Sequence, residues 1–278
     1  MGLKSNIKNL IKMTREKQLV PVEHVIDKDK MLKDKVAVII GGSGGIGLAI
    51  ARSFAESGCK IILCGTNEKK LRMCLENFVD KENVKTMVFN IADAKLMRDN
   101  VEKAVQLFGK VDILVNSAGV HTENVSFDTM TPEEFDRVMN INLRGPFFIC
   151  QAFAEYMVKA KSSDKRHILL VSSSRGSEPA WSPYGISKWA LNGLTMGLAQ
   201  TLLPHGIIVN AIAPGSTATE LIGVKEGDSI TTGENRVGRL AMPDEVANLA
   251  KLLVSPAGDM IVGETVHISG GRGVIDIR

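Results

Sequence analysis

The chain has 278 residues, a length that suits one large domain or two small ones. Hydrophobic residues make up 44% of it and charged residues 23%, the balance of a globular protein with a sizeable core. The net charge of +3 is too small to indicate a nucleic-acid-binding protein. No apolar run reaches the roughly 18 residues that a membrane-spanning helix needs.

The first 33 residues differ from the rest of the chain. The segment IKNLIKMTREKQL (7–19) predicts a basic amphipathic helix, which Pro21 would end. We expect residues 1–33 to form an extension, a helix or a strap, that packs on the body or on a neighbouring subunit. Membrane-surface binding and disorder are the alternatives. Because this stretch carries no secretion signal, we expect a cytoplasmic protein without a membrane partner.

From residue 34 onward, short apolar segments alternate with longer amphipathic ones. The apolar segments are nearly continuously hydrophobic, as in strands covered on both faces. The predicted strands are 36–40, 60–64, 86–90, 111–116, 167–173, 207–213 and 265–269. The predicted helices are 46–57, 94–108, 132–160, 184–203 and 243–254. This alternation predicts one α/β domain at 34–278, a Rossmann-like, doubly wound parallel sheet of about seven strands flanked by helices.

The first predicted strand leads directly into a glycine-rich turn, GGSGGIG, at residues 41–47. Gly41, Gly45 and Gly47 have the spacing G-x-x-x-G-x-G. A chain that turns sharply here and opens a helix can bring its backbone close to a pyrophosphate, with the positive end of the helix dipole facing the anion. After a first strand, this pattern predicts a dinucleotide-binding loop.

The end of the second strand is expected to meet the ribose of such a dinucleotide. The sequence CGTNEKK (64–70) has no acidic residue before Glu68, whereas an acid at this turn would bind a free 2′-hydroxyl. Gly65, Thr66 and the lysines at 69 and 70 therefore favour NADP over NAD, with NAD still possible. Alternatively, Thr66 caps a helix and both lysines are solvated.

Two later strand ends fall at the same edge of the sheet. NIAD (90–93) follows the third predicted strand, so Asn90 and Ile91 are candidates to contact the adenine. NSAG (116–119) follows the fourth, where Asn116 is expected to tie neighbouring strands together and Gly119 to let the backbone pass close to the cofactor.

The cysteines give no sign of a metal site. They form no CxxC pair and have no histidines at ligand spacing, which indicates reduced, buried thiols. They are Cys59, Cys64, Cys74 and Cys150.

Together with the glycine turn and NSAG, four further motifs occur in an informative order. They are INLRG with Asn142, LLVSSSRG at the end of the fifth strand, YGISK with Tyr184 and Lys188 one helical turn apart, and NAIAPGSTATE (210–220). In this order, the motifs closely resemble the short-chain dehydrogenase/reductase family over residues 34–271.

That resemblance implies a set of catalytic residues. Tyr184 would act as acid or base toward a carbonyl or alcohol, and Lys188 would lower its pKa and hold the nicotinamide ribose. Asn142 would anchor a water that links Lys188 to solvent. Among the three serines at the strand end, the S-x-x-G pattern selects Ser173 to hydrogen-bond the reacting oxygen.

The motifs together define the expected cofactor site. The expected cofactor-binding residues are Gly41, Ser43, Gly44, Gly45, Ile46, Gly47, Gly65, Thr66, Asn67, Asn90, Ile91, Asn116, Ala118, Gly119, Tyr184, Lys188, Pro214, Gly215, Thr217 and Thr219.

The substrate is expected to be a carbonyl compound or alcohol that is fairly small or open-ended, because the segment that covers it, at about 219–239, is short. Polyols, sugar acids, 3-oxoacyl thioesters and hydroxysteroids are all candidate classes. Candidate pocket residues are His121, Ser174, Arg175 and Trp181, although Arg175 could instead pair with Glu178. The resemblance also implies a homo-oligomer, a dimer or a tetramer. The alternative function is a catalytically silent regulator or scaffold that senses nucleotides. The complete set of four catalytic residues argues against that alternative, because a protein without turnover has no need of them.

Overall fold

The computed structural model describes residues 30–160, 164–225 and 227–274. The helix predicted at 7–19 and nearly all of the N-terminal extension lie outside these residues. The last residues of the extension are described. Leu32 is fully buried, and the backbone N–H of Leu32 donates to Ser57 O at 3.1 Å. Within the described ranges, no helix has the length and hydropathy needed to cross a membrane.

Seven parallel strands form a single sheet in the order β3-β2-β1-β4-β5-β6-β7. The strands are β1 (Val36–Ile40), β2 (Lys60–Gly65), β3 (Val84–Val88), β4 (Ile113–Asn116), β5 (Arg166–Val171), β6 (Ile207–Pro214) and β7 (Thr265–Ile268). This order reverses direction between β1 and β4, and the carboxyl ends of strands at such a switch point form the usual ligand crevice of open α/β sheets. The predicted Rossmann-like fold is confirmed.

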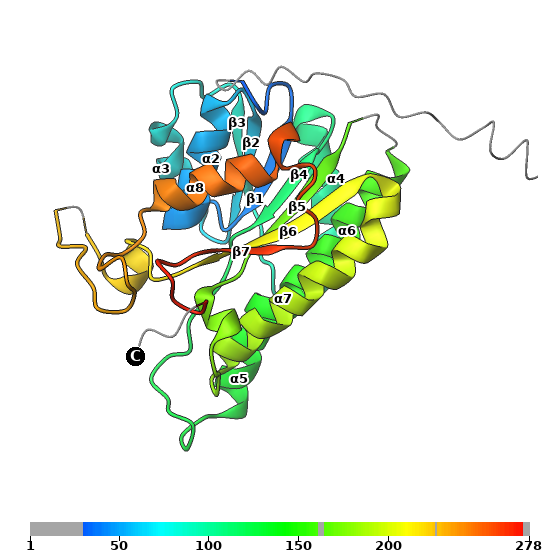
Figure 1. Cartoon of the computed structure of the whole chain (residues 1–278). Helices are drawn as coiled ribbons and strands as arrows, with labels where there is room; N and C mark the ends of the chain where they lie inside the picture. Colours follow the sequence, from blue (N-terminus) through cyan, green and yellow to red (C-terminus); the bar gives the residue numbers. More distant parts are fainter. Residues whose placement is uncertain (1–29, 161–163, 226, 275–278) are drawn as a thin grey trace, which may run out of the picture.

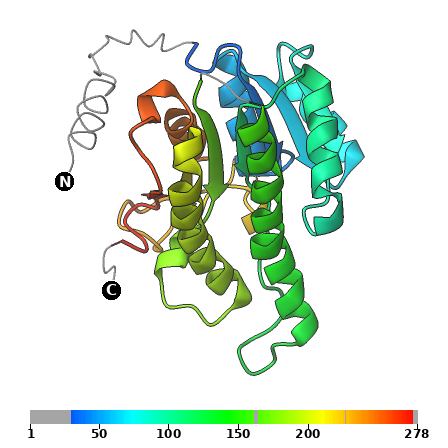
Figure 2. The same cartoon turned by 90° about the vertical axis from the view of Figure 1, so that its right-hand side faces the viewer.

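Helices cover both faces of this sheet, giving three layers (Figure 1). The helices are α2 (Gly45–Glu56), α3 (Glu68–Cys74), α4 (Met97–Phe108), α5 (Pro132–Met139), α6 (Gly145–Lys159), α7 (Pro183–Leu202) and α8 (Pro243–Leu253). Buried side chains of α2, α3 and α8 form one core with the sheet, and those of α4, α6 and α7 form the other. Figure 2 shows the long helices α6 and α7 side by side along the second face.

Successive residues of one strand supply both cores, because side chains alternate across a sheet. Val36, Val38 and Ile40 of β1 face α4, α6 and α7, whereas Ala37 and Ile39 face α2 and α8. Every β1 side chain is therefore apolar and buried. This arrangement explains the continuous hydrophobic runs of the sequence.

Two predicted elements differ clearly from the structure, and one helix was not predicted. The third strand lies at 84–88 rather than 86–90, which leaves Asn90 in the loop that follows it. The predicted helix 132–160 is divided by a π-helical turn at Asn140–Arg144, while its predicted start at residue 132 is confirmed, with Thr131 as the N-cap. Helix α3 was absent from the predicted helices, and Asn67 caps it rather than Thr66 by accepting from Lys70 N at 2.9 Å.

Candidate active site

The glycine-rich turn between β1 and α2 depends on missing side chains. Gly41 has a φ of +77°, which disfavours other residues, and a Cβ there would lie 2.7 Å from Ala118 N. A Cβ at Gly47 would lie 2.3 Å from Gly41 O, and one at Gly45 would lie 2.6 Å from Thr219 Cγ2. The turn therefore packs against the loop after β4 and the start of the covering segment, with no room for larger residues.

The amino end of α2 has the chemistry of an anion site. Gly44 occupies the N-cap position and offers no side chain to the first backbone N–H groups of the helix. Such groups, together with the helix dipole, favour a phosphate. The bare turn and the uncapped helix fit the pyrophosphate of a dinucleotide.

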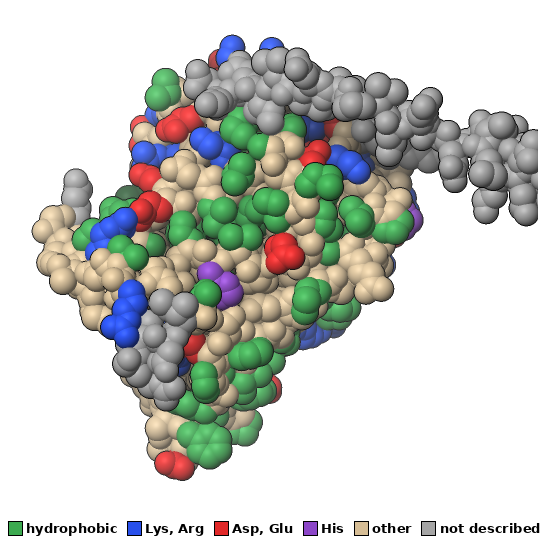
Figure 3. Space-filling model, in the orientation of Figure 1, with side chains coloured by type: hydrophobic (Ala, Val, Ile, Leu, Met, Phe, Trp, Pro, Cys, Tyr) green, Lys and Arg blue, Asp and Glu red, His purple; other side chains and the backbone are tan. Residues whose placement is uncertain are grey.

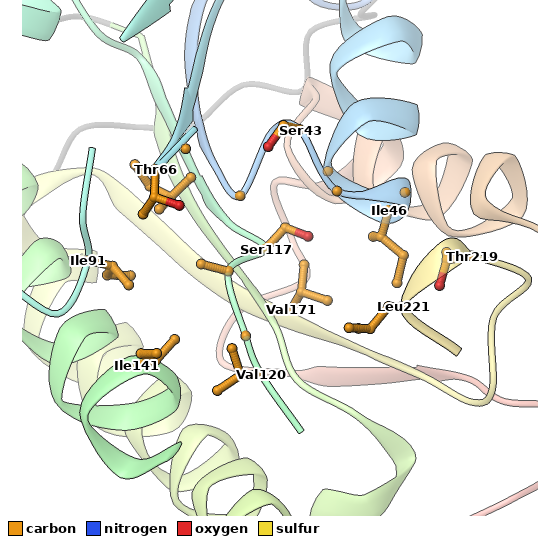
Figure 4. Close-up of a pocket in the computed structure, with 18 of the residues that line it drawn as sticks. Ser43, Ile46, Thr66, Ile91, Ser117, Val120, Ile141, Val171, Thr219 and Leu221 are labelled. Atoms are coloured by element: carbon orange, nitrogen blue, oxygen red, sulfur yellow. The ribbon is translucent and has the colours of Figure 1, made fainter. Parts of the chain in front are cut away.

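A cavity of about 580 Å³ runs from this turn along the carboxyl ends of the strands. Figure 4 shows Thr66 and Ile91 toward one end of it and Thr219 and Leu221 toward the other. The residues predicted to bind cofactor that line it are Gly41, Ser43, Gly44, Gly45, Ile46, Gly47, Gly65, Thr66, Asn90, Ile91, Ala118, Gly119, Tyr184, Lys188 and Thr219. Lining residues that the sequence did not single out include Val120, Ile141 and Leu221.

Five predicted cofactor residues do not line this cavity. Asn67 is occupied as the cap of α3, and Asn116 is buried, with its Oδ1 3.4 Å from Ala118 N. Pro214, Gly215 and Thr217 line a second cavity instead. These five residues lie outside the wall of the first cavity, and their part in cofactor binding stays a prediction.

An ion pair of Lys70 with Glu220 lies in the wall of the first cavity. Lys70 of α3 lines the cavity and lies 3.4 Å from Glu220 of the covering segment. Both partners are largely exposed, so this ion pair contributes little stability. A Cβ at Gly65 would lie 3.0 Å from Ser43 Oγ, a hydroxyl that can rotate away.

Tyr184 of α7 lies where the first cavity meets the second, and Lys188 of the same helix lines the first. Lys188 is buried, its Nζ lies 5.6 Å from the centre of the Tyr184 ring, and it donates to Val171 O at 2.9 Å. Ser173 lines the second cavity together with Tyr184 and acts to lower the pKa of the Tyr184 hydroxyl. Its neighbour Ser172 donates instead to Asn192 Oδ1 at 2.6 Å, deeper under the helix.

Asn142 lies in the π-helical turn and is fully buried. Its Oδ1 accepts from Val120 N and its Nδ2 donates to Val120 O, both at 2.9 Å. The side chain thus satisfies both backbone groups of one residue in the loop after β4. Gly119 of that loop lies close to both Asn142 and Lys188: a Cβ there would be 3.5 Å from Asn142 Oδ1 and 3.6 Å from Lys188 Nζ.

Burial controls the acidity of these groups. It raises the pKa of Tyr184, and the Ser173 hydrogen bond and the charges of Arg175 and Arg272 lower it in part. Burial also lowers the pKa of Lys188 to about 8. The net pKa shift of Tyr184 is therefore upward, and the groups that oppose it are Ser173 and the two arginines rather than the predicted Lys188.

His121 lies against the face of Tyr184, with the ring centres 4.2 Å apart and the rings 26° from parallel. Burial, and then the charges of Lys188 and Arg175, lower the pKa of His121, so its imidazole is neutral near pH 7. His121 lines both cavities and forms part of the boundary between them.

The second cavity, of about 430 Å³, opens beside Tyr184 and Ser173. All four predicted pocket residues, His121, Ser174, Arg175 and Trp181, line it. Arg272 and Glu234 also line it, and sequence reasoning missed both because they lie beyond the motifs. Their contacts link segments far apart in the chain, which no local pattern signals.

Among the described residues, no group of three His, Cys, Asp or Glu side chains is placed to hold a metal ion. The four cysteines are free and buried.

Comparisons with known proteins agree with this arrangement. The family model described as short chain dehydrogenase matches residues 35–228. The chain is 32% identical to a 3alpha-hydroxysteroid dehydrogenase of Mediterraneibacter gnavus, over 86% of this chain and 97% of that protein.

Solved structures have the same fold. A 3-ketoacyl-(acyl-carrier-protein) reductase from Brucella melitensis, complexed with NADH, is 31% identical with a TM-score of 0.76, over 87% of this chain and 100% of the other. The F189W actinorhodin polyketide ketoreductase, with NADPH, is 25% identical with a TM-score of 0.78, over 87% of this chain and 98% of the other.

Proposed function

This chain belongs to the short-chain dehydrogenase family of NAD(P)-dependent oxidoreductases, and on that premise we propose that it uses NADP(H) to interconvert a small carbonyl compound and its secondary alcohol. The observation that carries the proposal is the place of Tyr184. Its side chain lines both the cavity that begins at the glycine-rich turn and the second cavity, which Ser173 also lines. A proton donor at that junction can reach a substrate held beside the cofactor.

Each nearby residue has a role in the reaction. The nicotinamide, when bound, supplies or accepts the hydride. Tyr184 gives its proton to the carbonyl oxygen during reduction, and its raised pKa keeps it protonated at neutral pH. Ser173 hydrogen-bonds the same oxygen, and buried Lys188 holds positive charge beside the ring.

Asn142 is assigned a positioning role in this proposal. Its paired hydrogen bonds hold Val120, and with it the loop that carries Gly119 and His121 along both cavities. The cofactor would lie along that loop. Its pyrophosphate would meet the amino end of α2, and Thr219, which packs against Gly45, would close the end of the cavity opposite Thr66.

The preference for NADP rests on the end of the cavity near Thr66. No acidic residue follows β2 before Glu68, and Lys70 lines the cavity there. Because the Lys70–Glu220 ion pair is exposed, little free energy is lost when Lys70 turns to a 2′-phosphate. The same end would accept NAD more weakly.

We also infer that the protein forms a homo-oligomer. Helices α6 and α7 expose Phe147, Trp189 and Met196. Figure 3 shows mostly uncharged surface over β7 and its surroundings, with charged side chains concentrated near α2 and α3. Light scattering should give the mass of a dimer or a tetramer, and a monomer at micromolar concentration would contradict this inference.

A panel of carbonyl compounds and alcohols, followed by nicotinamide absorbance with both cofactors, tests the proposed activity. We expect turnover of at least one member, faster with NADPH than with NADH. If both cofactors bind tightly but none of the panel reacts, the chain is better described as a nucleotide-sensing regulator or scaffold.

A further inference from the structure

Four charged residues form one connected network at the second cavity, and three of them, Arg175, Glu234 and Arg272, line its wall. The Glu178 carboxylate accepts from Arg175 Nη1 at 2.7 Å and from Arg272 Nε at 2.8 Å. Arg272 also pairs with Glu234 of the covering segment, and its Nη1 lies 3.4 Å from Ser216 Oγ. The network therefore joins the segments before α7, after β6, before α8 and after β7.

The two arginines differ in how completely they are paired. Arg272 contacts two carboxylates, and only 20% of its side chain is exposed. Arg175 meets Glu178 through Nη1 alone, while 38% of its side chain is exposed along the cavity. Its Nε and Nη2 meet no acceptor within the described part of the chain.

The unpaired nitrogens of Arg175 have a specific geometry. Nε–H and Nη2–H lie on the same edge of a guanidinium and form the side-on fork that binds a carboxylate through two parallel hydrogen bonds. Glu178 occupies the opposite nitrogen and limits the movement of the group. The backbone N–H of Arg175 donates to Ser173 Oγ at 3.2 Å, so the Arg175 side chain leaves the backbone beside Ser173, and both residues line the second cavity.

The positive charge of Arg175 influences the pKa values of Tyr184 and His121. It acts to lower the pKa of Tyr184, against burial, and it adds to the effect of burial in lowering the pKa of His121. Glu178 and Glu234 offset much of the charge of the two arginines. A singly charged carboxylate therefore suits this cavity better than a dianionic phosphate.

We propose that Arg175 selects substrates that carry a carboxylate near the reacting carbonyl, with Glu178 and Arg272 holding its guanidinium in place. The substrate class is small oxo acids and the corresponding hydroxy acids, sized to a cavity of about 430 Å³. This inference rests on the proposed carbonyl chemistry and adds the charge of the substrate to it. Arg175 is a binding residue, and Arg272 is a positioning residue.

The test compares acetoacetate and levulinate with their methyl esters, each with NADPH, in the wild type and in variants. The wild type should prefer the acid of each pair in kcat/KM. Arg175→Gln should lower kcat/KM for the acids about 10- to 100-fold, the range expected for a lost charge-assisted contact, and leave the esters within about threefold. Arg175→Lys, which retains the charge without the fork, should recover part of the loss.

Arg272→Gln tests the positioning role separately. With Arg272 gone, Glu178 is free to neutralise Arg175 more fully, so KM for the acids should rise while kcat and the KM values of the esters hold. Arg98→Gln removes an exposed ion pair with Glu155 on the outer surface and serves as the matched control. Unchanged NADPH affinity in every variant shows that the fold is intact.

Three outcomes of this substrate comparison would contradict the proposal. An acid preference that is absent in the wild type, or that survives Arg175→Gln, overturns the assignment to Arg175. Turnover of neutral ketones alone overturns it too, although the proposed function then stands. Tight cofactor binding with no hydride transfer to any carbonyl removes both.

Discussion

Asn142→Ala removes a side chain that pairs with both backbone polar groups of Val120. The substitution leaves the N–H and C=O of Val120 without these partners. Asn142→Asp is the finer perturbation, since one carboxylate oxygen can still accept from Val120 N. The second carboxylate oxygen of the Asn142→Asp variant would replace the Asn142 amide nitrogen that donates to Val120 O, so two oxygens without a hydrogen between them would face each other.

The expected loss follows from the burial of the two groups. An unpaired buried polar group costs about 1–3 kcal/mol. Asn142 is fully buried, but Val120 is only partly buried, so water can reach its N–H and C=O. The cost of leaving each of these two groups unpaired should therefore be about 1 kcal/mol, the lower end of that range. Asn142→Ala should therefore lower the free energy of unfolding by about 2 kcal/mol. At about 2–4 °C per kcal/mol for a chain of this size, the melting temperature should fall by about 4–8 °C.

Thermal unfolding followed by circular dichroism, together with kcat and KM for a carbonyl substrate, measures both effects. Asn142→Asp should be at least as destabilised at neutral pH and should recover stability as the pH falls, because protonation restores a donor. A melting temperature within about 1 °C of wild type, combined with a large fall in kcat, would refute this reasoning. Asn142 would then act on the proton path instead of holding the loop.

Three further predictions concern the cofactor. Gly41→Ala should weaken NADPH binding more than about tenfold, because the new Cβ would lie 2.7 Å from Ala118 N at a residue whose φ is +77°. The control Gly193→Ala, whose Cβ would have nothing within 4 Å, should leave the affinity unchanged, and equal affinities of the two variants would contradict the role of close packing in the turn. Gly65→Asp should lower the ratio of kcat/KM for NADPH to that for NADH about tenfold or more, because the new carboxylate repels the 2′-phosphate. Gly65→Asn is the uncharged control, and an unchanged ratio in Gly65→Asp would show that this end of the cavity does not determine the cofactor preference. Because the pKa of Lys188 in the free protein is lowered to about 8, its charge is present below that pH and lost above it. NADPH affinity measured by fluorescence should weaken as the pH rises through that value, and a flat profile would count against a charged Lys188 at the site.

The parts of the fold that local patterns control could be predicted from the sequence. Continuous apolar runs located the strands because both sheet faces are covered, and the spacing of the glycines located the turn after β1 because only glycine fits there. The spacing of Tyr184 and Lys188 placed both on one face of α7. These features depend on residues that are neighbours along the chain.

Features that depend on distant contacts could not be predicted in this way. The π-helical turn at Asn140–Arg144 lies where Asn142 meets Val120, a contact between two separate elements. Asn67 rather than Thr66 caps α3. Because both residue types are favourable at an N-cap, the sequence alone could not show which of the two begins the helix. The pairing of Glu178 with Arg272 joins residues 94 positions apart.

The rate of hydride transfer in a single turnover of Tyr184→Phe tests the central claim most directly. The ring and its packing against His121 remain in this variant, and only the hydroxyl is lost. We predict that the rate falls at least about 100-fold, the usual contribution of a general acid, while NADPH affinity stays within about threefold of wild type. A rate near that of the wild type would contradict the assignment of Tyr184 as the proton donor.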